Sequence, residues 1–79
     1  MDATQIGNMI RFHRKKSGLS QEGLAKLAGL GKTVVFDAEK GKQTIQLSTL
    51  LQLLKVLNIT LSFQSPLMKN FEDHLNEKS

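Results

Sequence analysis

Residues 20–40 read SQEGLAKLAGLGKTVVFDAEK, and they contain the most informative structural signals of the chain. Ser20 is a good N-cap, because its hydroxyl can accept a hydrogen bond from the first turn of a helix. Gly29 can adopt a positive φ and so ends that helix abruptly. A second helix is predicted over residues 32–40. The short, glycine-containing joint forces the two helices to cross steeply, which is the geometry of a helix-turn-helix.

Two apolar residues fit a close crossing of these helices. Ala25 is small at the point where the helices approach each other, and Val35 is placed to fill the space between them. An ordinary helical hairpin is the alternative. The joint occurrence of Ala25, Gly29 and flanking basic residues favours the helix-turn-helix over the hairpin.

The remaining sequence predicts an all-α fold of four to five helices with one short C-terminal β-strand. Helices are expected over residues 4–17, with Thr4 as the N-cap, and over residues 47–57, where leucines cover a wide arc. From residue 59 to residue 63 the apolar period changes to every second residue, which indicates a strand. A lone strand needs hydrogen-bond partners, so we expect it to pair with the same strand of a second chain.

Charge is concentrated in the first half of the chain. Between residues 11 and 42, eight basic side chains stand against three acidic ones, a net charge of +5, whereas residues 65–79 have a net charge of −1. Such a positive field favours polyanionic partners. A solvated, lysine-rich surface is the alternative that charge alone leaves open.

Several classes of function are not expected from this composition. There is no cysteine, and the two histidines are 61 positions apart, so neither a disulfide nor a zinc site is expected. Gly31-Lys32-Thr33 matches the end of a phosphate-binding P-loop, but Lys26 occupies the position of its required glycine. We therefore expect no enzyme activity, cofactor or metal. No membrane span or signal peptide is indicated either, which favours the cytoplasm.

Three short stretches resemble a known family of helix-turn-helix domains. They are Leu19-Ser20-Gln21-Glu22-Gly23-Leu24-Ala25, Ala28-Gly29-Leu30 and Glu39-Lys40-Gly41-Lys42. They are similar to the lambda-repressor-like domain of Cro and XRE type, and the resemblance extends over residues 6–61. The predicted strand and the segment at 31–37 resemble HipB-type antitoxins, which are transcriptional regulators encoded beside a HipA-type serine/threonine kinase toxin.

The resemblance implies DNA contacts for several side chains. Lys32 and Thr33, at the start of the second helix of the motif, would reach base edges in the major groove. Phe36 and Asp37 would follow one turn later as further base contacts. The phosphate backbone would be bound by Ser20, Gln21, Lys40, Lys42 and Gln43.

Departures from the family pattern leave alternatives open. Gly23 replaces the usual glutamate, so the capping box of its helix is lost and the helix starts less firmly. Phe36 is either a core residue, filling the space that Ala38 leaves, or an outward contact to thymine methyl groups. Asp37 could accept a hydrogen bond from cytosine N4 or orient a neighbouring lysine.

Other residues would hold the chain together or meet partners. Arg14 and Glu39 occupy positions where this family often has an ion pair that locks two helices, and we expect a structural role for them. The predicted dimer interface comprises Leu50, Leu54, Leu57, Ile59, Leu61 and Phe63. The predicted contacts to a protein partner are Leu67, Met68, Phe71 and Leu75.

The chain is therefore expected to divide into residues 1–64, a helix-turn-helix DNA-binding and dimerisation domain, and residues 65–79, a polar C-terminal tail or short helix. We expect a homodimer that binds an inverted-repeat operator in double-stranded DNA and represses its own operon. We also expect it to act as the antitoxin of a HipA-like kinase toxin. A stand-alone repressor without a toxin, and a protein-only adaptor whose basic face is incidental, are the alternatives.

Overall fold

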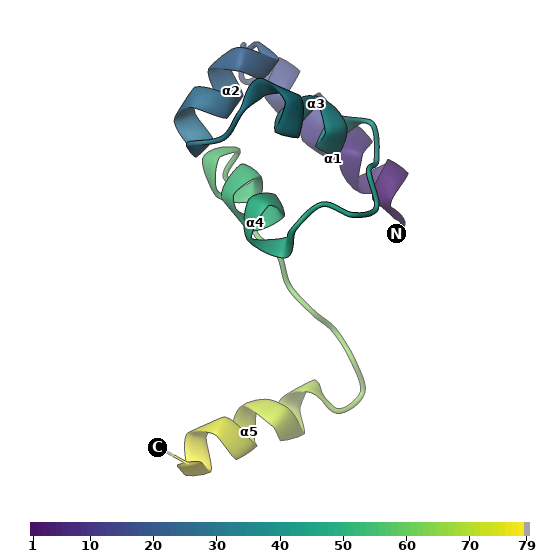
Figure 1. The fold of residues 1–79 in the computed structure, drawn as a ribbon. Coiled ribbons are helices and arrows are strands. Elements are labelled where there is room, and N and C mark those ends of the chain that lie inside the picture. Colours follow the sequence, from purple (N-terminus) through teal and green to yellow (C-terminus); the bar gives the residue numbers. More distant parts are fainter. Residues whose placement is uncertain (79) are drawn as a thin grey trace.

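The computed structural model of the chain describes residues 1–78, and Ser79, the last residue of the predicted tail, lies outside them. Within the described residues the helices are α1 (Ala3–Lys16), α2 (Gln21–Ala28), α3 (Lys32–Glu39), α4 (Leu47–Val56) and α5 (Met68–Lys78). Helices α1 to α4 pack together, and α5 stands apart at the end of a long connection (Figure 1). The predicted all-α, helix-turn-helix fold is confirmed.

Local signals set both ends of α2. Ser20 accepts a hydrogen bond from the backbone N–H of Gly23 at 2.9 Å, so α2 is capped without the glutamate that the family usually has. Gly29 adopts φ 68° at the other end. The N–H of Leu30 then donates to the carbonyl of Ala25 at 2.8 Å, which satisfies an acceptor that the helix itself leaves open.

The start of α1 differs from the prediction, because Asp2 and not Thr4 is the N-cap. The Asp2 carboxylate accepts a hydrogen bond from the N–H of Gln5 at 2.8 Å. The Gln5 side chain in turn accepts one from the N–H of Asp2 at 2.9 Å. This reciprocal capping box satisfies two backbone donors at once, and it places Thr4 inside the helix.

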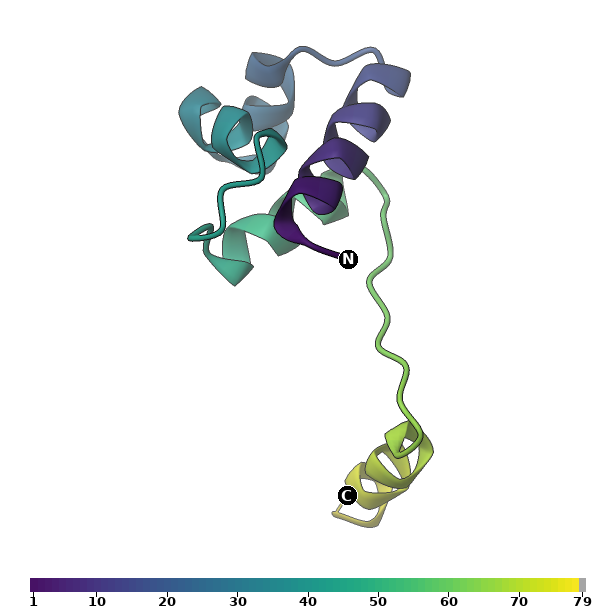
Figure 2. The ribbon, with the colours of Figure 1, turned by 90° about the vertical axis from the view of Figure 1, so that its right-hand side faces the viewer.

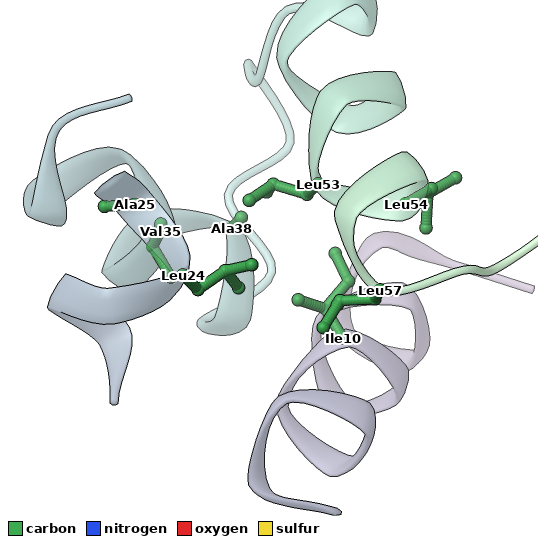
Figure 3. Close-up of a cluster of buried hydrophobic side chains, with 8 residues drawn as sticks. All are labelled: Ile10, Leu24, Ala25, Val35, Ala38, Leu53, Leu54 and Leu57. Atoms are coloured by element: carbon green, nitrogen blue, oxygen red, sulfur yellow. The ribbon is translucent and has the colours of Figure 1, made fainter. Parts of the chain in front are cut away.

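The hydrophobic core lies where α1, α2, α3 and α4 meet, as Figure 3 shows. Each of these four helices contributes one fully buried large side chain, and these side chains are Ile10, Leu24, Val35 and Leu53. Ala25 and Ala38 are also buried, and their small side chains allow the helices around them to pack closely. The roles predicted for Ala25 and Val35 at the helix crossing agree with this packing.

Helix α1 also lies very close to the end of α3. A Cβ atom added to Gly7 would be 2.6 Å from the carbonyl oxygen of Ala38 and 2.7 Å from that of Glu39. Gly41, which has φ 84°, also lies close to Thr4, because a Cβ added to Gly41 would be 2.9 Å from the Cα of Thr4. Glycine is therefore required at both positions, and α1 is held directly against the last turn of α3.

The strand predicted over residues 59–63 is not formed, and no strand is found among the described residues. Asn58 adopts φ 58° after α4, and the N–H of Ile59 donates to the carbonyl of Leu54 at 2.9 Å. The chain then runs away from the bundle as an extended connection to α5 (Figure 2). The physical reason is that a strand needs a neighbouring backbone, and α1 to α4 offer it none.

Two residues of the predicted dimer interface belong to the core of the single chain. Leu54 and Leu57 are only 4% and 7% exposed, because they pack against the other helices. Leu50 and Ile59 are half-buried against the same cluster, whereas Leu61 and Phe63 are 47% and 73% exposed. The prediction was wrong for Leu54 and Leu57, since the domain itself covers more of the leucine arc of α4 than expected.

Over the described residues, no helix combines the length and apolar character that crossing a membrane requires. The same part of the chain has no group of three or more histidine, cysteine or acidic side chains arranged to hold a metal ion.

Candidate nucleic-acid interface

The ion pair predicted between Arg14 and Glu39 is present, and it joins α1 to α3. The Nε atom of Arg14 lies 2.6 Å from Oε2 of Glu39, and its Nη2 atom lies 3.0 Å from Oε1. The remaining guanidinium nitrogen, Nη1, donates to the carbonyl of Leu19 at 2.8 Å. Since only 9% of the Arg14 side chain and 3% of the Glu39 side chain are exposed, this is a buried pair in which every guanidinium nitrogen donates a hydrogen bond.

The surroundings of Arg14 raise its pKa above the ordinary, already very high value. The largest cause is the hydrogen bond to Glu39, burial acts in the opposite direction, and the negative charge of Glu39 adds to the increase. Arg14 is therefore charged at every pH at which the protein would be studied. A permanent charge here compensates the carboxylate of Glu39 within the domain.

The exposed face of α3 presents the residues predicted to touch bases. Lys32 and Thr33 lie exposed in its first turn. Phe36 is 46% exposed, and the Nζ atom of Lys40 lies 5.5 Å from the centre of its ring. The open question about Phe36 is thus decided, because its ring points outward and Ala38 alone occupies the core position.

Asp37 lies on the flank of this face, and its carboxylate is paired with a lysine. The Nζ atom of Lys42 is 3.4 Å from Oδ2 of Asp37. Of the two roles considered for Asp37, orienting a neighbouring lysine is the one that matches this geometry. The pair lies at a hollow of about 290 Å³ that Thr44 and Gln46 also line.

A second hollow lies on the opposite flank of α3. Its volume is about 340 Å³, and we name it the α1–α3 pocket; its lining residues are Thr4, Asn8, Arg11, Gln21, Phe36, Glu39 and Lys40. Gln21, predicted to meet a phosphate, donates from Nε2 to Oε1 of Glu39 at 3.2 Å. The second N–H of the Gln21 amide is not used in this hydrogen bond, so Gln21 can still donate to a ligand at the pocket.

The structure therefore gathers most of the predicted DNA-contacting residues around α3. Ser20 lies exposed at the start of α2, and Lys42 and Gln43 lie exposed in the segment after α3. Sequence reasoning missed Asn8 and Arg11, which α1 brings beside Lys40 in the α1–α3 pocket. Their spacing of three residues on one helix face was the available signal, but it does not show which neighbouring helix that face adjoins.

Comparison with known proteins agrees with this architecture. The helix-turn-helix family matches residues 10–64 of the chain. The uncharacterized HTH-type transcriptional regulator y4mF of Sinorhizobium fredii is 38% identical over 61 residues, which cover 77% of this chain and 80% of that protein. The control protein C.SmaI of Serratia marcescens is 39% identical over 59 residues, which cover 73% of this chain and 70% of that protein.

Solved structures share the fold. The restriction-modification controller protein C.AhdI of Aeromonas hydrophila has a TM-score of 0.67 and 36% identity, over 73% of this chain and 88% of that one. A structure of a HipA–HipB–O2–O3 complex matches with a TM-score of 0.76 at 23% identity, over 84% of this chain and 93% of that one. From the family match and these relatives, the chain belongs to the helix-turn-helix family, in its Cro/XRE class of DNA-binding transcriptional regulators.

Proposed function

We propose that this protein is a homodimeric, sequence-specific repressor that binds an inverted-repeat operator in its own promoter. The observation that supports this most directly is the placement of α3. The Arg14–Glu39 pair fixes the buried side of α3. The exposed side presents Lys32, Thr33 and Phe36. A helix that is fixed on one side and polar or basic on the other suits insertion into the major groove.

In this proposal the exposed residues of α3 read base edges. Lys32 donates to O6 and N7 of a guanine, and Thr33 contacts a thymine methyl group or donates a hydrogen bond. Phe36, whose ring is outward, contacts a thymine methyl group. Asp37 acts through Lys42, whose ammonium group it holds in place.

The phosphate backbone is bound on both flanks of α3. Ser20 and Gln21 lie at the start of α2, where free backbone N–H groups and the helix dipole favour an anion. Lys40 lies at the end of α3, and Lys42 and Gln43 follow it. These contacts would fix the register of the domain on DNA without selecting a sequence.

Two copies are proposed to associate through the exposed apolar side chains of α4 and of the segment that follows it. Leu47 and Leu51 are exposed on α4, and Leu61 and Phe63 are exposed beyond it. Residues 59–63 would gain the missing backbone partners by pairing with the same segment of a second copy. Two-fold symmetry would then place the two half-sites about 34 Å apart or at a multiple of that distance.

A salt titration of the full chain against its own upstream DNA and against random DNA of equal length tests the proposal. A regulator of this kind should prefer the upstream DNA, lose affinity steeply as salt rises, and bind with two protomers per operator. If the two DNAs bind equally well, the protein is not a sequence-specific regulator. If neither binds, a protein-only adaptor would explain the fold better.

The apolar side of α5 supports the narrower proposal that the protein is also the antitoxin of a HipA-like kinase. Leu67, Phe71 and Leu75 are exposed, and Met68 is half-buried. An isolated helix of 11 residues is only marginally stable in water, so a protein partner that covers the apolar side of α5 would stabilise it. Co-purification with the product of a neighbouring kinase-like gene would support this role.

A controller of a restriction-modification system is the second candidate. C.SmaI and C.AhdI are 39% and 36% identical to this chain, whereas HipB in its complexes is 23% identical. On this proposal the protein regulates transcription with no toxin partner. Expression of the native operon would then yield a homodimer alone, and the regulated promoters would include that of a neighbouring nuclease or methyltransferase gene.

A further inference from the structure

The outer side of α1 forms a basic surface that the proposed function has not used. Asn8, Arg11, Phe12 and Lys15 are exposed and follow the spacing of neighbours on one helix face. They line a shallow hollow of about 300 Å³. We name Asn8, Arg11 and Lys15 the α1 strip.

The positive charge of the α1 strip is not compensated within the described part of the chain. Helix α1 contains no acidic residue, and neither Arg11 nor Lys15 belongs to an ion pair there. Lys16 lies beside the strip, with its Nζ atom 5.7 Å from the centre of the Phe12 ring. Several unpaired cations on one face favour a polyanion as the partner.

The α1 strip is continuous with the proposed DNA-reading face. Asn8 and Arg11 line the hollow on the outer side of α1 and also the α1–α3 pocket, where Phe36 and Lys40 lie. The only acidic residue in that pocket, Glu39, already accepts hydrogen bonds from Arg14 and Gln21. An uninterrupted basic path therefore runs from Lys40 across Arg11 to Lys15.

The two hollows beside α3 match the arrangement of the phosphate backbones on either side of a helix in the major groove. A helix in the major groove has one phosphate backbone on each side of it. On one flank of α3 lies the hollow with Lys42 and Thr44, and on the other lies the α1–α3 pocket. The α1 strip thus lies on the side of one backbone, and its two cations are about 6 Å apart along the helix axis.

We propose that the α1 strip binds the phosphate backbone of the DNA next to the half-site read by α3, extending the contacts beyond the motif itself. This inference rests on the proposed function, because it requires α3 to lie in the major groove. An acidic protein surface would also suit unpaired cations. The continuity of the strip with the pocket beside Phe36 and Lys40 favours DNA.

The double variant Arg11→Gln/Lys15→Gln of the full chain tests this, with binding to upstream and random DNA measured at several salt concentrations. Each phosphate contact contributes about 0.9 to the slope of log affinity against log salt, so the slope should become shallower by about 1.8. Both DNAs should lose affinity by the same factor. The Lys55→Gln/Lys69→Gln variant, with the same charge change on α4 and α5, should keep the parent slope.

A charge-conserving variant, Arg11→Lys/Lys15→Arg, separates charge from folding, and it should keep the parent slope. If the parent binds its upstream DNA and the Arg11→Gln/Lys15→Gln variant has the same slope and affinity, the α1 strip does not bind DNA. A slope that falls equally in the Lys55→Gln/Lys69→Gln variant would also overturn the inference. If the parent itself fails to bind DNA, the proposed function falls together with it.

Discussion

Arg14 and Glu39 connect α1 to α3 through two hydrogen bonds of 2.6 and 3.0 Å between a buried guanidinium and a buried carboxylate. A planar guanidinium opposite a carboxylate fixes both distance and orientation. The pair therefore sets how α1 lies against α3, the helix proposed to read DNA. Gln21 joins the same carboxylate from α2, so all three helices around the α1–α3 pocket meet at Glu39.

Replacing Glu39 by alanine should strongly destabilise the domain. The change leaves the buried charge of Arg14 without its partner, which costs about 3–5 kcal/mol in the free energy of unfolding. Urea denaturation of the variant and the parent measures the difference. Glu22→Ala is the matched control, because Glu22 forms only an exposed pair with Lys26 at 4.0 Å and its loss should change stability by about 0.5 kcal/mol or less.

The stability that this pair contributes should not fall at alkaline pH within the usual experimental range. Because the folded-state pKa of Arg14 is raised, its contribution is fully present below the ordinary pKa of arginine. That contribution is lost only as the pH rises through the still higher folded-state value. Urea midpoints of the parent and of Arg14→Met between pH 7 and about 9 should differ by a constant amount. A gap that narrows steadily with pH would contradict the assignment.

Gly7→Ala should force α1 away from α3. The new methyl group would lie 2.6 Å from the carbonyl oxygen of Ala38, which belongs to backbone and cannot rotate aside. Overpacking of this kind costs about 1–3 kcal/mol, measurable as a lower thermal midpoint. Gly31→Ser is the control, and it should not lower the thermal midpoint. A Cβ at Gly31 meets nothing within 4 Å, and the serine hydroxyl can cap α3. Equal midpoints for Gly7→Ala and the parent would mean that the two helices are not in close contact.

Lys32→Ala should relax specificity at one base position. The loss of a contact to a base edge costs about 1–3 kcal/mol for the preferred base and little for the others. Competition binding with operators substituted one base pair at a time measures this. Lys42→Ala should instead weaken binding to all sequences alike, because its proposed contact is to phosphate. If both variants bind the operator as the parent does, α3 is not the reading helix.

Phe63→Glu should weaken self-association and, through it, operator binding. Phe63 is exposed and lies in the segment proposed to pair across the two-fold axis, where a charge would be buried next to its symmetry mate. Sedimentation equilibrium should show a higher dimer dissociation constant. Leu27→Glu places the same charge at an exposed leucine of α2 and should leave the dimer intact. A Phe63→Glu chain that stays dimeric at all concentrations would exclude this surface.

A chain ending at Gln64 should bind its operator nearly as well as the full chain. Helix α5 stands apart from α1 to α4, so its removal takes no side chain from the hydrophobic core (Figure 1). Parallel titrations of the two chains check the expectation, and co-purification with a candidate kinase should be lost in the shortened form. A truncated chain that no longer binds DNA would show that α5 serves the DNA-binding unit.

The motif itself could be predicted from sequence because its signals are local. The hydroxyl of Ser20 reaches a backbone N–H only three residues away, and the positive φ of Gly29 is a property of the residue itself. The same local reasoning failed at the start of α1, where Asp2 and Thr4 can both cap. Asp2 is the cap because Gln5 lies at the spacing that completes the capping box.

The burial of Leu54, Leu57 and Phe36 could not be predicted from sequence, because it depends on which other helices pack against them. The leucine spacing of α4 predicts a wide apolar arc, but only the packing of α1 and α2 shows that Leu54 and Leu57 are covered within one chain. For the same reason, the sequence left open whether Phe36 is a core residue or an outward one. Whether a helix residue is buried depends on which neighbour faces it, and the residue's own spacing carries no such information.

The helix-turn-helix of residues 20–40 and its basic character follow from the sequence alone, because caps, glycine turns and charge act over a few residues. The tertiary structure alone decided that Phe36 points outward, that residues 59–63 form no strand within one chain, and that Arg11 lies beside Lys40. The positions of Phe36 and Arg11 depend on how α1 crosses α3, which is set by the contact of Gly7 with α3 and by the Arg14–Glu39 pair. Residues 59–63 form no strand because, among the described residues, no neighbouring backbone lies beside them.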